Sequence, residues 1–298
     1  MKAIATELQK ARELAAGGIV GVNIMVATRG YEDYVRAAVR AGADLIISGA
    51  GLPMNLPALT EGSRTKIAPI VSGRKAAEVI FKYWTKKYDR LPDLVVIEGP
   101  KAGGHLGFSP DELERYLSGE LDYDDEIRRI IAFVKERSKE RQAESGQIGS
   151  GPAEIPVVVA GGVYTREDAE HMIALGADGV QMATRFVTTY ECDAPDVYKQ
   201  AYIHAEESDI TLVKSPVGMP GRAIRNAFLE RTREGRIPHG KCHLCVSTCK
   251  SAETPYCITE ALVNAAEGRV ADALLFAGSN AYRAKELEHV HDIMREFA

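Results

Sequence analysis

The sequence predicts an α/β fold, a TIM-type (β/α)8 barrel, because short apolar runs alternate with segments of helical spacing. Seven runs are enriched in β-branched residues and have the length of strands. Alternation of this kind requires a parallel sheet closed by crossover helices. The 298 residues, of which 45% are hydrophobic and 27% charged, can bury the core of one such barrel.

The predicted strands follow one another with room for a helix after most of them. They are residues 19–26, 45–48, 67–71, 94–97, 156–160, 179–182 and 210–213. Helical spacing is clearest in residues 31–41, 75–86 and 167–175, and residues 2–15 form a predicted helix before the first strand. An eight-stranded barrel requires one more strand, so we expect that its first strand is missing from this chain or replaced by another element.

The remaining segments complete the predicted organisation. Residues 122–142 carry apolar side chains at helical spacing among many charges, residues 145–152 form a connector, and residues 258–267, 274–280 and 282–297 have helical character. We therefore predict a barrel in residues 1–236. The Cys-rich segment and the helices of residues 237–298 would pack on it.

Composition excludes several functional classes. The formal net charge is −5 and no long basic run occurs, which argues against nucleic-acid binding. No apolar stretch reaches the roughly 18 residues of a membrane span. The first residues have a helical pattern without a cleavage site, so we expect neither a signal peptide nor a transit peptide, and a cytoplasmic location.

One strand end carries a histidine in a glycine-rich turn. After the apolar run 94–97 come Glu98, Gly99, Pro100, Lys101, Ala102, Gly103, Gly104, His105, Leu106 and Gly107. Glycines let the backbone approach a flat ligand, while His105 presents an imidazole that exchanges a proton near neutral pH. The turn is therefore a candidate active site, with His105 as the catalytic residue.

Two further strand ends predict a phosphate site. The run 157–160 ends in the paired glycines Gly161 and Gly162, and the run beginning at residue 177 ends in Gln181, Met182, Ala183 and Thr184. Turns of this kind offer backbone N–H groups to a phosphate, and in βα barrels the phosphate site usually follows the last two strands. A cofactor phosphate is the expected occupant.

These motifs together resemble the FMN-dependent nitronate monooxygenase family, which also contains flavin-dependent enoyl-ACP reductases. The matching segments are residues 21–25, 48–51, 102–107, 160–162, 181–186 and 221–222. The resemblance implies that residues 1–236 form an FMN-binding barrel. It also implies that His105 acts as a base toward a nitroalkane or positions an enoyl substrate, and that Arg222 lies near the substrate mouth. The positions that match the family's cofactor-binding residues are Asn23, Glu98, Gly103, Gly104, Ala160, Gly161, Gly162, Gln181, Met182, Ala183 and Thr184.

The resemblance leaves more than one activity open. The first is oxidation of alkyl nitronates or nitroalkanes with dioxygen by a monooxygenase. The second is NAD(P)H-dependent reduction of an enoyl-ACP or enoyl-CoA, because the reductases tend to have glutamate where this chain has Glu98. A third is a metal-stabilised protein without flavin activity. The expected partners are a small-molecule substrate, NAD(P)H or a ferredoxin-like electron donor, and a second copy in a homodimer.

Four cysteines form a compact array near the C-terminus. Cys242, Cys245, Cys249 and Cys257 have the spacing C-x-x-C-x-x-x-C-x7-C, which suits a tetrathiolate zinc ion or a [4Fe–4S] cluster. Disulfides are unfavourable in a reducing cytosol. The alternatives are therefore an iron–sulfur cluster, a zinc ion, or four reduced thiols, whereas Cys192 stands apart and is interpreted as structural.

Overall fold

The structure is a computed structural model that describes residues 2–144 and 154–298. The chain forms two compact units. The first unit comprises Met1–Ile97, Asp122–Val159 and Leu175–Gly179, and the second comprises Glu98–Leu121, Ala160–Ala174 and Val180–Ala298. The predicted boundary between residues 236 and 237 falls inside the second unit and stays a prediction. The predicted connector 145–152 lies outside the described residues.

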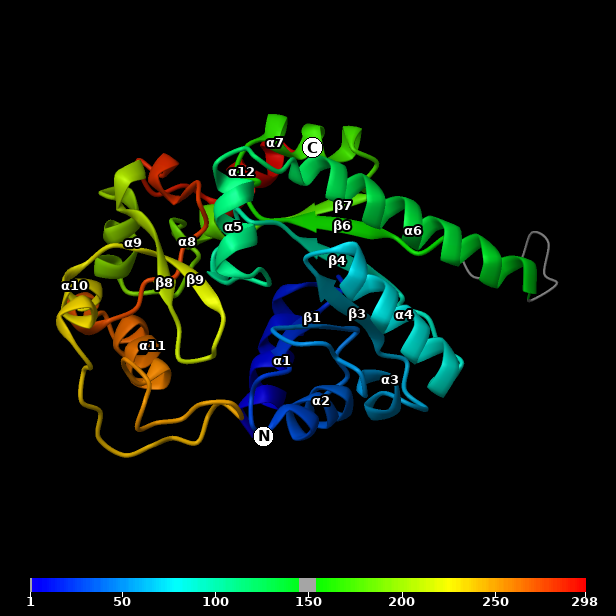
Figure 1. The fold of residues 1–298 in the computed structure, drawn as a ribbon, viewed down its shortest axis with the longest axis horizontal. Coiled ribbons are helices and arrows are strands. Elements are labelled where there is room, and N and C mark those ends of the chain that lie inside the picture. Colours follow the sequence, from blue (N-terminus) through cyan, green and yellow to red (C-terminus); the bar gives the residue numbers. More distant parts are fainter. Residues whose placement is uncertain (1, 145–153) are drawn as a thin grey trace. The chain divides into compact units, whose positions relative to one another are not determined.

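Six strands form one sheet in the order β1-β2-β3-β4-β6-β7 (Figure 1). They are β1 (Gly21–Met25), β2 (Leu45–Gly49), β3 (Lys66–Val71), β4 (Val95–Glu98), β6 (Val157–Ala160) and β7 (Gly179–Gln181). The pairs β1–β2, β2–β3 and β3–β4 are parallel. The predicted α/β class and the first six predicted strands are therefore confirmed.

Helices alternate with the strands of the first unit, and the first helix precedes the first strand. They are α1 (Lys2–Leu14), α2 (Tyr31–Arg40), α3 (Leu56–Leu59), α4 (Arg74–Tyr88) and α6 (Tyr123–Glu144). In α6, Ile127, Ile130 and Val134 are buried, as their helical spacing predicts. Phe133 of the same helix meets Phe81 of α4 edge to face, with ring centroids 5.3 Å apart. The apolar face of α6 thus packs on α4.

An aspartate that precedes a strand binds the beginning of the neighbouring strand at three places in this sheet. Asp44 accepts from Val20 N, Asp93 from Ile67 N and Asp178 from Val157 N, each at 2.9 Å. The backbone N–H of each aspartate donates to the carbonyl of the same partner, at 2.8 to 2.9 Å. Each pair of strand beginnings is therefore joined by two hydrogen bonds, an arrangement we call the aspartate clasp.

The second unit contains a separate antiparallel sheet in the order β5-β9-β8 (Figure 1). Its strands are β5 (Gly104–His105), β8 (Ile210–Lys214) and β9 (Pro220–Ile224). The prediction that residues 210–213 form a further strand of the parallel sheet is wrong, because β8 turns back directly into β9. Among the described residues the main sheet thus has six strands, and β1 is the first of them.

The helices of the second unit are short. They are α5 (Pro110–Leu117), α7 (Arg166–Ala174), α8 (Thr184–Val187), α9 (Asp196–Ile203), α10 (Ala227–Glu234), α11 (Ile258–Ala266) and α12 (Val290–Glu296). Ser109 and Glu112 form a capping box at the start of α5, directly before Pro110. Among the helices of residues 2–144 and 154–298, none combines the length and the apolar character that crossing a membrane requires.

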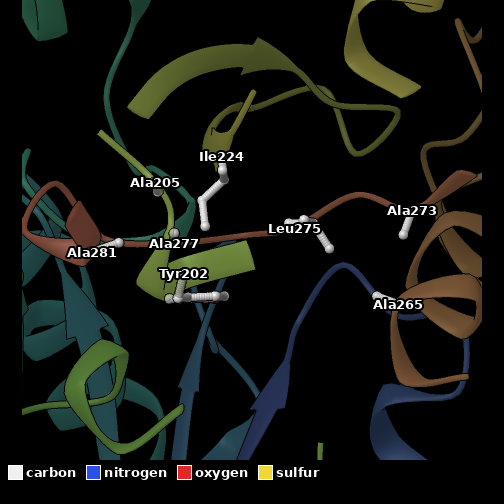
Figure 2. Packing of buried hydrophobic residues seen from close by; sticks show 8 residues of the cluster. All are labelled: Tyr202, Ala205, Ile224, Ala265, Ala273, Leu275, Ala277 and Ala281. Atoms are coloured by element: carbon white, nitrogen blue, oxygen red, sulfur yellow. The ribbon is translucent and has the colours of Figure 1, made fainter. Parts of the chain in front are cut away.

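A cluster of small and apolar side chains forms part of the core of the second unit. Ile224 and Tyr202 face opposite sides of an extended segment that carries Leu275 and Ala277 (Figure 2). Ile224 N donates to Leu275 O, and Ala277 N donates to the carbonyl of Arg222. The predicted helix at residues 274–280 is therefore wrong, because this backbone bonds to β9 instead of to itself. Helix α11 confirms the helix predicted at 258–267.

Candidate active site

The glycine-rich turn after β4 bonds to two neighbouring strands. Gly99 N donates to Ala160 O at 2.9 Å, at the end of β6. After the turn, β5 pairs with β9, so that Gly104 lies opposite Arg222 and His105 opposite Gly221. Gly104 has φ of 72°, in the left-handed region that favours glycine. The turn thus presents His105 from an anchored strand.

His105 is held by a serine that the sequence analysis did not identify. Its Nε2 lies 2.7 Å from Oγ of Ser215, in the loop after β8, and Ser215 is buried. The imidazole meets the ring of Phe276 edge to face at 4.9 Å. Burial lowers the pKa of His105 to about 4. The imidazole is therefore neutral at pH 7, with one of its two ring nitrogens unprotonated and able to accept a proton.

Glu98 ends β4 and provides the second titratable group of the turn. Burial raises the pKa of its carboxyl to about 7. Glu98 therefore exchanges its proton near neutral pH, above the ordinary range of a carboxyl group. Glu98 and His105 thus have pKa values shifted in opposite directions by the same cause, which is the pattern of an acid and a base held in one site.

Arg222 of β9 binds the backbone carbonyls of the turn. Its guanidinium is buried and its Nη1 donates to Pro100 O at 2.7 Å and to Ala102 O at 2.5 Å. Burial lowers the pKa of Arg222 to about 10. These contacts fix the carbonyls of the turn. The predicted role of Arg222 near the substrate mouth stays a prediction.

The glycines at the strand ends allow close packing of neighbouring turns. Gly161 and Gly162 have φ of 96° and 91°, and a Cβ at Gly161 would lie 3.0 Å from Ala102 N. A Cβ at Gly103 would lie 2.6 Å from the backbone of Ala277 and Gly278. A side chain would therefore force these turns apart.

Residues 278–280 meet the predicted phosphate turns, although no sequence pattern marked them. Gly278 N donates to Oγ1 of Thr184 at 3.0 Å, and Asn280 Nδ2 donates to Gly162 O at 2.6 Å. Between them, Ser279 N donates to Lys101 O at 3.0 Å. The hydroxyl of Ser279 is buried, and within the described part of the chain it has no hydrogen-bond partner. A buried hydroxyl of this kind can bind a ligand atom or an ordered water.

The structure brings most predicted cofactor residues into the second unit. Glu98, Gly103, Gly104, Ala160, Gly161, Gly162, Gln181, Met182, Ala183 and Thr184 all belong to it. Thr184 begins α8, directly after Gln181, Met182 and Ala183 at the end of β7. Asn23 belongs to the first unit, where it is exposed on β1 and lines an apolar cavity of about 670 Å³ with α1. Its assignment to the flavin stays a prediction.

Helix α8 is fixed by a buried ion-pair network. Arg185 is 8% exposed and donates to both carboxylate oxygens of Glu288, at 3.0 and 2.7 Å, and it pairs with Glu296 at 2.7 Å. Its guanidinium also lies over the ring of Tyr164. The turn that contains Thr184 is therefore tied to the C-terminal residues of the chain.

The four cysteines of the array lie in the long connection between α10 and α11 and at the start of α11 (Figure 1). All four are free thiols. Burial, and then the neighbouring thiols Cys245, Cys242 and Cys257, raise the pKa of Cys249. Among the described residues, the metal-ligating atoms within 4.8 Å of one another belong to His243, Cys257 and Glu260. Whether the array binds a metal stays a prediction.

Comparison with known proteins agrees with this arrangement. The family model "Nitronate monooxygenase" matches residues 2–298. A probable nitronate monooxygenase of Staphylococcus haemolyticus is 34% identical over 150 residues, which are 49% of this chain and 36% of that protein. One of Staphylococcus aureus is 30% identical over 149 residues, with the same coverage. The chain thus matches little more than a third of the length of these relatives.

Solved structures share the fold. FabK of Thermotoga maritima has a TM-score of 0.69 at 22% identity, over 98% of this chain and 81% of that one. A nitroalkane oxidase of Streptomyces ansochromogenes has a TM-score of 0.68 at 19% identity, over 98% and 85%. The fold is thus of the TIM-barrel type. Since the family model spans nearly all residues, this chain belongs to the nitronate monooxygenase family.

Proposed function

We propose that this protein is an FMN-dependent oxidoreductase that oxidises alkyl nitronates or nitroalkanes with dioxygen. Family membership and the chemistry of the turn after β4 support the proposal. The observation that carries it is a half-buried histidine that stays neutral at pH 7 and is oriented by Ser215. A neutral imidazole in a fixed orientation can accept the α-proton of a nitroalkane.

The residues of the second unit fit a flavin phosphate. Ser279 offers a buried hydroxyl without a partner among the described residues, next to the turns of Gly162 and Thr184. No atom lies within 4 Å of the position that a Cβ would occupy at Gly104. A flat ring could therefore approach the backbone there. These residues would hold FMN at its phosphate and its ring. When bound, FMN would accept the electrons that the substrate loses.

The roles of the side chains follow from their contacts. Ser215 holds Nε2 of His105. We assign the ring proton to Nε2, which then donates to Ser215 Oγ, so that Nδ1 would take the substrate proton. Phe276 covers one edge of the imidazole and excludes water from it. Arg222 keeps the carbonyls of Pro100 and Ala102 in place, which positions the turn that carries His105. The products expected from a nitronate are a carbonyl compound and nitrite.

Glu98 favours a second function, the NAD(P)H-dependent reduction of an enoyl thioester. Addition of hydride to an enoyl group leaves a carbanion that needs a proton. With its pKa raised to about 7, Glu98 could supply that proton at neutral pH, whereas His105 with a pKa of about 4 could not. Protonated Glu98 is thus the acid that this alternative requires.

The two functions are separated by direct assay of the purified full chain. We expect twin flavin absorption bands and release of nitrite from propyl nitronate in air. His105→Ala should lower turnover of nitroethane at least 100-fold, whereas His204→Ala, at an exposed position, should not change it. Oxidation of NADPH by crotonyl-CoA without nitrite formation would decide for the reductase. Protein that binds no FMN would overturn both.

A further inference from the structure

We propose that residues 242–257 hold a [4Fe–4S] cluster through Cys242, Cys245, Cys249 and Cys257. The site lies in the second unit, in the connection between α10 and α11, and it is separate from the residues assigned to FMN. Its thiols are all reduced, and three of them are partly buried. The inference does not depend on the proposed flavin chemistry, because iron and sulfide can be measured without flavin.

The backbone between the first two thiols adopts an unusual conformation. Leu244, between Cys242 and Cys245, has φ of 51°, in the left-handed region that a leucine rarely adopts. Its side chain is 57% exposed, so apolar burial does not explain this conformation. Strain of this kind persists where surrounding structure or a ligand needs it.

Three of the thiols surround the fourth. Cys245, Cys242 and Cys257 all lie close enough to Cys249 to interact with its thiol electrostatically. Four cysteines gathered in this way can all ligate one metal centre, which binds each of them as a thiolate.

The spacing of the sulfur atoms favours a cluster over a single zinc ion. Four sulfurs on one tetrahedral zinc lie about 3.8 Å apart, as Zn–S bonds of about 2.3 Å require. Within the described ranges, the ligand atoms found within 4.8 Å of one another are those of His243, Cys257 and Glu260, with a single thiol among them. No three of the thiols in these ranges therefore lie as close together as a single zinc ion requires, whereas a cube of four irons takes one cysteine at each corner.

Two contacts anchor the thiol segment to the loop that carries Ser215. Thr248 Oγ1 donates to Val217 O at 3.3 Å, and the hydroxyl of the buried Tyr256 donates to Lys214 O at 3.2 Å. Lys214 and Val217 lie on either side of Ser215 in the sequence. A cluster in this segment would therefore also stiffen the loop that orients His105.

The test is chemical analysis of the full chain, purified without oxygen or reconstituted with ferrous iron and sulfide. We expect about four iron and four acid-labile sulfide per chain, and an electron paramagnetic resonance signal after reduction by dithionite. Cys249→Ser should reduce the iron content by more than half. Cys242→Ser, at an exposed position with less risk to folding, should do the same. Cys192→Ser is the matched control and should retain all iron.

Three outcomes would overturn the proposal. One zinc per chain without sulfide would assign the segment to a zinc site around His243, Cys257 and Glu260. Absence of both metals after reconstitution would mean that the thiols are free. Equal loss of iron in Cys192→Ser and Cys249→Ser would show that the cluster does not depend on the array. The flavin content, measured on the same samples, reports separately on the proposed function.

Discussion

Nε2 of His105 lies 2.7 Å from Oγ of Ser215, although 110 positions separate the two residues in the sequence. Ser215 Oγ also accepts from Val217 N, at 3.3 Å, and the side chain is buried. The serine therefore cannot turn away without leaving a buried polar group unpaired. Its contact with Nε2 fixes the orientation of the His105 ring.

Ser215→Ala should lower kcat for nitroethane about tenfold, as loss of one hydrogen bond to the base implies. The KM should change less, because Ser215 acts through His105 and not on the substrate. Ser215→Thr should restore part of kcat, and the exposed Ser208→Ala should have no effect. Steady-state kinetics with the three variants checks this. Equal losses in kcat and in flavin content would point to a structural role instead.

Acid should destabilise the protein partly through His105. The folded-state pKa of about 4 lies below the ordinary 6.5, so the unfolded chain binds a proton first as the pH falls. The free energy of unfolding should therefore fall between pH 6.5 and 4. In His105→Gln this part of the fall should be absent, and His204→Gln should behave like the parent. Urea unfolding at several pH values measures the difference; identical pH profiles for all three proteins would contradict it.

Glu98 should act on stability in the opposite direction. Its folded-state pKa of about 7 lies above the ordinary 4.5. Its contribution to the free energy of unfolding is therefore fully present below pH 4.5 and is lost as the pH rises through 7. The free energy of unfolding of Glu98→Gln, relative to that of the parent, should thus be higher at pH 8 than at pH 4.5. The exposed Glu61→Gln serves as the control. A stability difference between Glu98→Gln and the parent that does not vary with pH would refute this.

Two adjacent glycines should respond differently to alanine. At Gly103 the new Cβ would lie 2.6 Å from the backbone of Ala277 and Gly278, so Gly103→Ala should destabilise the protein by about 3 kcal/mol and release flavin. At Gly104 the new Cβ would have no atom within 4 Å. Gly104→Ala should therefore destabilise the protein by only about 1 kcal/mol, because alanine is strained in the left-handed backbone conformation. Thermal unfolding and flavin retention measure both. A larger effect at Gly104 would refute the packing that the structure gives Gly103.

An aspartate clasp should contribute more to the free energy of unfolding than a surface ion pair does. Asp178→Ala removes the acceptor of Val157 N and should destabilise the protein by about 1–2 kcal/mol. Asp125→Ala breaks an exposed pair with Arg128 and should cost less than about 0.5 kcal/mol. Urea titration compares the two variants, and equal effects would mean that the clasp contributes little.

The sequence predicted the parallel strands well, because β-branched runs between turns need no tertiary information. It failed at residues 210–213, where the short loop 215–219 returns β8 onto β9 and only pairing distinguishes the two sheets. It also failed at residues 274–280, whose two leucines and one alanine favour a helix. There the hydrogen bonds to Arg222 and Ile224 override local preference.

The sequence predicted those parts of the candidate site that a local motif marks. The turn with His105 and the glycine pair at 161–162 were visible because glycine at a strand end has a local meaning. Ser215, Ser279 and Asn280 were not visible, since a lone serine or asparagine has no signature. Their partners His105, Lys101 and Gly162 lie more than 100 residues away along the chain.

The aspartate clasps of Asp44, Asp93 and Asp178 also limit how the sheet can assemble. A strand that slips by one residue against its neighbour turns every side chain to the opposite face. Each clasp consists of two hydrogen bonds between the beginnings of two neighbouring strands. A strand that slipped by one residue would break both of them. At these three strand pairs the clasps therefore favour the native register over a slipped one by two hydrogen bonds each.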